Sequence, residues 1–263
     1  PQDGRPDPLW SRGLGDVYKR QIMGSTQKNV MKKPKQTMNK LAHNINKSGP
    51  TPYTAKAEKM MKKKPVEQTI GKPDETKDDG TFKLVPPRDP RVNSAIAPFT
   101  DDMLKEHGIK DRKELTDRMF KTMLKYGGIG LTANQVGLPF NMFVLGAHDH
   151  IEKGLKMACF NPMIISKSEE EVMMKEGCLT FPFVFLSINR PRKVVVKYQD
   201  ENGDLKEGHL DGVVSRVFQH ELDHCLGKNM TDRVSKFKLD LAYKKAEKQM
   251  KAYEKHKKAM ANL

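Results

Sequence analysis

The hexapeptide QHELDH (residues 219–224) is the part of the sequence that most restricts how the chain folds. It lies within residues 213–226, where apolar residues recur at helical spacing and a glycine ends the pattern. His220 and His224 are four residues apart, so a helix places both imidazoles on one face, where they can bind one metal ion. Glu221 follows the first histidine, and its carboxylate can exchange a proton with water beside that ion. The pattern is typical of the metal-binding helix of a hydrolase.

A third metal ligand is needed, and the residues leave two sources open. Metalloproteases of the zincin type take it from a downstream helix. The downstream carboxylates here belong to a Lys-rich, solvated pattern and are Asp232, Asp240, Glu247 and Glu254. Cys178, within KEGCLTFP (residues 175–182), offers a thiolate instead. Gly177 allows a tight turn and Phe181-Pro182 is expected to end the element, which predicts that Cys178 lies on a shaped loop.

A glycine-rich segment, GIGLTANQ (residues 128–135), follows a helical pattern at residues 113–126. Its small residues permit a ligand to approach the backbone closely, and Gln135 places an amide donor there. No Gly-Lys-Ser/Thr follows, so the segment is not a phosphate-binding loop.

The remaining periodicity predicts an α+β fold, with small antiparallel sheets around the metal-binding helix. Apolar and β-branched runs predict strands at residues 141–145, 157–160, 163–165, 192–199 and 205–210. Asn161-Pro162 is expected to separate the second and third strands, and Asn202-Gly203 to form a hairpin turn before the last. A Lys-rich helix is expected at residues 239–258.

The net charge of +15 is concentrated near the two ends of the chain. Residues 23–77 hold thirteen Lys and four acidic residues, and residues 235–263 hold nine Lys and three acidic residues. These segments contribute +9 and +6, so the rest of the chain is nearly neutral. We expect residues 1–22 to be a non-native, adaptor-derived segment and residues 23–79 to be a disordered basic extension. Residues 80–234 are then the catalytic domain, followed by a basic C-terminal helix.

The composition also bears on the compartment. No apolar run approaches the roughly 18 residues that cross a bilayer, so we expect no membrane contact. Three cysteines are too few for a disulfide scaffold, which favours a reducing compartment. We therefore expect a cytoplasmic protein, with organelle targeting through residues 23–57 as the alternative.

Taken together, the three segments resemble the peptide deformylase family, whose motifs GφGφAAxQ, EGCLS and QHExDH occur in the same order. They stand here as GIGLTANQ, EGCLT and QHELDH, and the resemblance covers about residues 82–234. Thr132 replaces the usual first alanine of the pair, and we expect it to alter the pocket or the rate. Thr180 replaces the usual serine with little expected effect. Phe185 stands near the position where many bacterial members carry an arginine, which bears on substrate preference.

The resemblance implies a metal-dependent hydrolase that removes the formyl group from N-formylmethionine on nascent polypeptides and releases formate. Cys178, His220 and His224 would hold one divalent ion, typically Fe²⁺ in this family, with Zn²⁺, Ni²⁺ or Co²⁺ as substitutes. Glu221 would take a proton from the attacking water and deliver it to the leaving amine.

The resemblance also implies how the substrate is bound. The Gln135 amide and the Leu179 backbone N–H would meet the developing oxyanion. The substrate-binding residues would be Gly128, Gly130, Leu131, Gly177 and Val217.

Two other functions fit parts of the sequence. A zincin-type metalloprotease would share the helix but need a downstream ligand, and a deformylase-like core without activity could serve as an RNA-binding or ribosome-binding adaptor. The basic helix at residues 235–263 could contact the ribosome in either an active or an inactive protein, and we expect the chain to be a monomer.

Overall fold

The computed structural model describes residues 80–148, 151 and 154–261, and the predictions for residues 1–22 and 23–79 lie outside them. The helices are α4 (Asp102–Glu106), α5 (Arg112–Lys125), α6 (Gly212–Cys225) and α7 (Lys236–Ala261). Short 3-10 helices are η1 (Pro90–Asn93), η2 (Ala133–Val136) and η3 (Met230–Arg233). The strands are β1 (Gly130–Thr132), β2 (Met142–Gly146), β3 (Lys156–Lys167), β4 (Glu171–Cys178), β5 (Phe181–Pro191), β6 (Lys193–Gln199) and β7 (Leu205–Asp211). Among the helices that these residues form, none is long and apolar enough to span a membrane.

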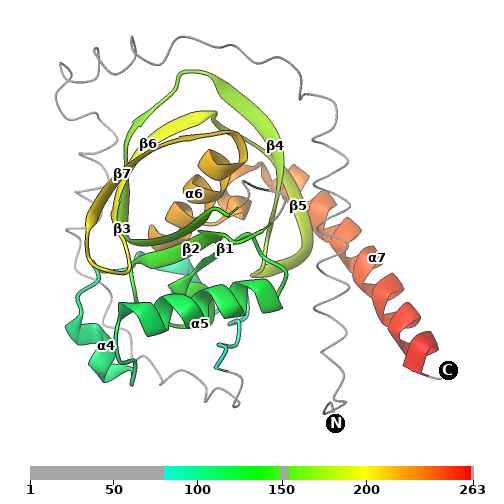
Figure 1. Ribbon diagram of the computed structural model, residues 1–263. Helices are drawn as coiled ribbons and strands as arrows, with labels where there is room; N and C mark the ends of the chain where they lie inside the picture. The colour runs from blue at the N-terminus through cyan, green and yellow to red at the C-terminus, as the bar shows by residue number, and fades with distance from the viewer. Residues whose placement is uncertain (1–79, 149–150, 152–153, 262–263) are drawn as a thin grey trace.

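The strands form two antiparallel sheets. Five of them pair in the order β1-β2-β3-β6-β7, and β4 pairs with β5 in a two-stranded sheet. The predicted hairpin at Asn202-Gly203 is confirmed, because Gln199 of β6 lies opposite Leu205 of β7 and Gly203 has a φ of +85°. Figure 1 shows the strands curving around α6, with α5 along one side and α7 projecting outward. The predicted α+β class is therefore confirmed.

Helix α6 lies at the centre because almost all of it is apolar or paired. Its residues 215–225 are all buried, including the polar ones. Val217, Phe218 and Leu222 pack against the sheet, where the rings of Phe218 and Phe143 meet edge to face at 5.0 Å. The helix thereby carries its histidines into the interior of the domain.

The other face of β2 packs against α5. Side chains alternate along a strand, so Phe143 and Leu145 face α6 whereas Met142 and Val144 face the opposite core. That second core receives Leu115, Met119 and Met123 from one side of α5. The thin sheet between two helices holds the segment from residue 128 to residue 135 rigidly beside α6.

The prediction that Asn161-Pro162 would separate two strands was wrong. Strand β3 is continuous across it, and the pairing register shifts between Phe160 and Met163 while Asn161 adopts a φ of +49°. The Asn161 side chain explains this bulge, because it accepts a 2.7 Å hydrogen bond from the Phe99 N–H and donates a 3.0 Å bond to the Phe99 carbonyl. The bulge therefore anchors the segment that enters the domain.

The hairpin of β4 and β5 corrects the expected position of Cys178. Cys178 is the last residue of β4, and Phe181-Pro182 begin β5 instead of ending an element. Only two residues separate the strands, and the register shifts between Gly177 and Cys178. A paired strand end fixes the thiol more firmly than the expected loop would.

Helix α7 begins at Lys236, within the predicted basic helix of residues 235–263 and before the pattern that starts at residue 239, and it packs on the hairpin. Leu239, Ala242 and Ala246 contact a small apolar cluster on β5 that includes Val184 and Ile188. The opposite face of the helix carries most of its lysines, so the contact is one-sided.

Candidate metal centre

Cys178 at the end of β4 meets His220 and His224 of α6. Their ligand atoms all lie within 4.8 Å of one another, and Cys178 Sγ is 3.2 Å from His224 Nε2. Ligands bound at about 2.0–2.3 Å to a shared ion lie at roughly this mutual spacing. All three side chains are buried, where polar groups require partners. The spacing, the burial and the soft donor set fit one transition-metal ion.

The electrostatic surroundings favour the metal-binding form of Cys178. Burial alone raises the pKa of its thiol, but the imidazoles of His224 and His220 outweigh burial and hold the pKa well below its usual range. Burial instead raises the pKa of Cys159 and Cys225 well above that range. Because the thiolate is the ligand, Cys178 is the cysteine prepared to bind an ion.

Glu176 fixes the orientation of His220. Its Oε2 accepts a 2.9 Å hydrogen bond from His220 Nδ1, which leaves Nε2 for an ion. Arg190 binds both oxygens of Glu176 at 2.7 and 2.9 Å, and Arg216 adds a 2.9 Å contact. Burial raises the pKa of Glu176, but the contacts with His220 and Arg190 outweigh burial and lower the pKa below its usual value, so the carboxylate stays charged.

Arg190 links the hairpin to α6. It is 1% exposed, and its Nη1 donates a 2.7 Å hydrogen bond to Asp223 Oδ2. Asp223 also accepts a 2.6 Å bond from Arg233. Sequence reasoning missed Arg190, because it lies in no motif and nothing among its neighbours marks it as buried. It also left Glu176 without a role, although its place beside Cys178 was a signal.

Replacing Arg190 with alanine is expected to lower the free energy of unfolding by about 3–5 kcal/mol, because Glu176 and Asp223 lose a buried partner. Urea denaturation measures the change. The matched control is Arg192→Ala, whose side chain is 46% exposed and pairs only at the surface. We expect that control to cost less than about 1 kcal/mol. Equal losses in the two variants would contradict the structural role of Arg190.

Glu221 follows His220 on α6 and is 4% exposed. Its Oε2 accepts a 2.7 Å hydrogen bond from Thr132 Oγ1. Burial raises the pKa of its carboxyl, against the opposing effects of His220 and His224. Gly130 is required beside it, since a Cβ at that position would lie 2.4 Å from Glu221 Oε1. The carboxylate is thus closely enclosed next to the metal ligands.

Gln135 projects from η2 toward Cys178. Its Oε1 accepts a 2.8 Å hydrogen bond from the Thr132 backbone N–H, which fixes which end of the amide is oxygen. Its Nε2 therefore donates, at 3.0 Å to Thr180 Oγ1, and lies 3.4 Å from Cys178 Sγ. The glycine-rich segment places an amide donor at the metal centre, as its sequence suggested.

A cavity adjoins the ligands and Glu221. Of the predicted substrate-binding residues, Gly128, Gly130, Gly177 and Val217 line it. Leu131 does not: it is fully buried in the core beneath α5, because neighbouring residues of β1 point to opposite faces. Apolar lining comes instead from residues that the sequence did not single out, Ile129, Met174 and Val213.

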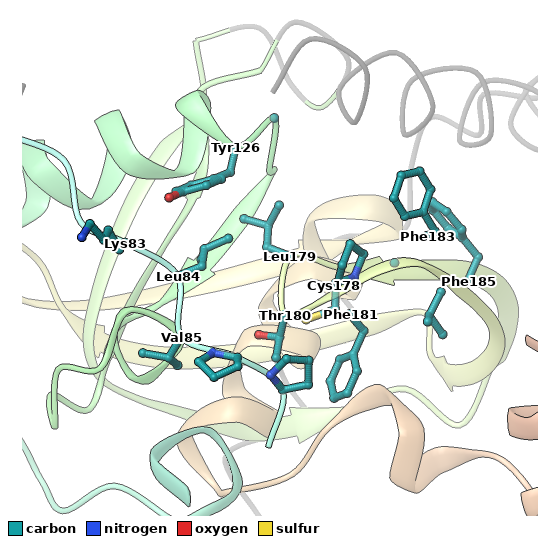
Figure 2. A pocket seen from close by; sticks show the side chains of 16 residues that line it. Lys83, Leu84, Val85, Tyr126, Cys178, Leu179, Thr180, Phe181, Phe183 and Phe185 are labelled. Carbon is teal, nitrogen blue, oxygen red and sulfur yellow. The ribbon is translucent and has the colours of Figure 1, made fainter. Parts of the chain in front are cut away.

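A second cavity of about 500 Å³ lies along the turn that follows Cys178. Figure 2 shows Leu84 and Val85 of the entry segment on one side and Leu179 of the β4–β5 turn facing them. Phe185 also lines this cavity, with the Lys175 ammonium 5.4 Å from its ring centroid. An apolar wall therefore continues outward from the metal centre.

Comparisons with known proteins identify the family of the chain. A family model for polypeptide deformylase matches residues 89–240. The peptide deformylase of Erythrobacter litoralis is 34% identical over 187 residues, which cover 62% of this chain and 94% of that relative. A crystal structure of a peptide deformylase from Legionella pneumophila has 28% identity and a TM-score of 0.57, covering 66% of this chain and 98% of that one. One from Synechococcus elongatus, in complex with actinonin, has 30% identity and a TM-score of 0.56, covering 68% and 94%.

The matched region includes every residue of the centre. It extends over more than half of the chain and contains Gln135, Cys178, His220, Glu221 and His224. The relatives are also covered over most of their own length, so the likeness is to whole proteins and not to one motif. This chain belongs to the polypeptide deformylase family.

Proposed function

We propose that the chain hydrolyses the formyl group from N-formylmethionyl peptides, releasing formate and a peptide with a free amino terminus. The observation that carries this is the meeting of Cys178, His220 and His224 beside Glu221 and Gln135, in a deformylase-family chain. The zincin alternative is not supported, because the cluster of metal-ligating groups in the described residues takes its third member from Cys178 and not from a downstream carboxylate.

Cys178, His220 and His224 would hold the ion, and Glu176 keeps His220 turned toward it. When bound, a divalent ion supplies a Lewis acid that makes water acidic enough to yield a nucleophile near neutral pH. We propose Fe²⁺ as the working ion, with Zn²⁺, Ni²⁺ or Co²⁺ able to occupy the same donors.

Glu221 is the proposed proton carrier. Its carboxylate lies beside the ligands and lines the cavity, so it can take the proton of the attacking water. The same carboxyl then gives that proton to the nitrogen of the leaving peptide, so the C–N bond breaks to a neutral amine. Its burial suits this exchange, because a raised pKa brings a carboxyl closer to neutral pH.

Gln135 and Leu179 are the proposed donors to the oxyanion that forms on the formyl carbon. The amide of Gln135 is held with Nε2 directed toward Cys178. Leu179 directly follows Cys178 in the short turn and lines the same cavity. A donor of this kind typically contributes about 3 kcal/mol to the transition state.

The cavity beside the ligands is the proposed site for the methionine side chain. Gly128 and Gly130 keep one wall close to the backbone, and Val217 and Val213 supply an apolar wall from α6. An unbranched thioether suits such a narrow apolar space. Gly177 lines both this cavity and the one beyond the turn, and we propose that a side chain there would crowd the substrate backbone.

The direct test is formate release from formyl-Met-Ala-Ser, with metal analysis of the same sample. We expect formate to appear, and the activity of an iron-loaded sample to decay in air while a zinc-loaded sample turns over more slowly. Cleavage of internal peptide bonds would favour the metalloprotease, and a metal-loaded sample without formate release would favour the inactive adaptor. An air-stable, fully active sample without iron would contradict the assignment of Fe²⁺.

We also propose that α7 contacts the ribosome, since its packing is one-sided and it exposes lysines that include Lys244, Lys248, Lys251 and Lys255. Cosedimentation with ribosomes at rising salt, comparing the full chain with a variant in which exposed lysines of α7 are neutralised, measures this. Equal binding of the two proteins would contradict it. The monomeric state and the cytoplasmic location stay predictions.

A further inference from the structure

We propose that Thr132 is a positioning residue that holds the Glu221 carboxylate in the orientation needed for proton transfer. The inference rests on the proposed role of Glu221, and it concerns a contact made by the side chain of this particular residue. Thr132 ends β1, is fully buried and is not among the residues that line the cavity.

The contact is directional. Thr132 Oγ1 lies 2.7 Å from Glu221 Oε2 and 3.2 Å from the Glu221 backbone carbonyl. A hydroxyl has one proton to donate, and the carboxylate oxygen is the nearer of the two acceptors. The threonine therefore donates to Oε2 and occupies one of the two carboxylate oxygens.

The other carboxylate oxygen of Glu221, Oε1, is confined by close packing against Gly130. Glu221 Oε1 faces Gly130, where a Cβ would come within 2.4 Å of it. Both residues line the cavity, whereas Thr132 lies behind them. Because Thr132 occupies Oε2, the geometry assigns proton exchange to Oε1, the oxygen that lies against the cavity-lining Gly130.

The side chain of Thr132 also contacts Gln135. The Thr132 backbone N–H holds Gln135 Oε1 at 2.8 Å, and the Thr132 side chain accepts from the Gln135 backbone N–H, which completes a capping box at the start of η2. A substitution that removes the hydroxyl therefore keeps the contact to the Gln135 side chain but removes this cap. A background without Glu221 separates the two effects, since only the loss of the cap can act there.

The test compares Thr132→Val, which keeps the branched shape but cannot donate, with Thr132→Ser, which keeps the donor. For Thr132→Val we expect kcat to fall about tenfold, with KM within about twofold and metal content unchanged, because the residue touches neither substrate nor ion. Thr132→Ser should stay within about twofold of the wild-type kcat. The matched control is Thr116→Val, since Thr116 of α5 is also buried and its hydroxyl has no partner among the described residues.

A double variant separates the positioning role of Thr132 from a role in packing alone. In a Glu221→Ala chain, Thr132→Val should cause no further loss, because the group it positions is gone. A wild-type kcat in Thr132→Val, an equal loss in Thr132→Ser, or a full additional loss in the Glu221→Ala background would overturn the proposal. If the wild-type chain releases no formate, the proposed function fails instead, so the two failures are distinguishable.

Discussion

Replacing Glu221 with alanine is expected to leave the metal content of the protein unchanged while formate release falls by roughly 10²–10⁴-fold. The reason is that Glu221 is not among the three clustered ligands but lies beside them, buried and facing the cavity. The other carboxylate that lines the cavity, Glu176, is already bound by His220, Arg190 and Arg216, so it does not replace Glu221 as the acceptor of the proton. Formate release and metal analysis on one preparation measure both quantities.

Glu221→Gln is the matched control for this substitution. It keeps the size of the side chain and can still accept the hydrogen bond from Thr132, but it cannot carry a proton. We therefore expect it to be as inactive as Glu221→Ala. Full activity in either variant would exclude Glu221 as the general base. Loss of metal from both variants would indicate that Glu221 is itself a metal ligand.

Replacing Cys178 with alanine is expected to remove the ion from the protein and formate release with it. Two imidazoles on one helix would remain, and a site with two ligands holds a transition-metal ion far more weakly than a site with three. The expected metal content falls from about one ion per chain to a small fraction of that. Metal analysis after dialysis against a weak chelator measures the loss.

Cys159→Ala is the control, because Cys159 is also a free, buried cysteine but packs in the core between the sheet and α6. It should lose some stability through the small cavity and keep its metal. Cys178→Ser tests whether size alone matters, and we expect it to bind metal poorly because a hydroxyl is a harder donor. Unchanged metal content in Cys178→Ala would exclude the thiol as a ligand.

The metal-binding helix could be predicted from the sequence because its information is local. An apolar face and two histidines four residues apart specify both the helix and the shared direction of the imidazoles. The hairpin at Asn202-Gly203 could be predicted for the same reason, because two adjacent turn residues specify it. The assignment of Cys178 to the centre came from the resemblance, since forty-six residues separate it from His224 and no periodicity connects them.

The β4–β5 hairpin could not be predicted for the opposite reason. Strand β4, EVMMKEGC, is mostly half-buried and has only three consecutive apolar residues flanked by charged ones, so it shows neither a long apolar run nor a strict alternation. Arg190 reads as an ordinary surface residue, yet it is buried because two carboxylates from separate elements converge on it. Leu131 sits one position from the cavity wall, and only the pleat of β1 decides that it faces the core.

The three proposed metal ligands come from two different parts of the domain, and this affects how the domain unfolds. Cys178 belongs to the two-stranded hairpin, whereas both histidines belong to the helix on the five-stranded sheet. An ion held by all three would therefore be a crosslink between two packing units, and Arg190 of β5 forms an ionic crosslink between the same two units through Asp223 of α6. The hairpin and the helix would then open together or not at all, so that they form one cooperative unit.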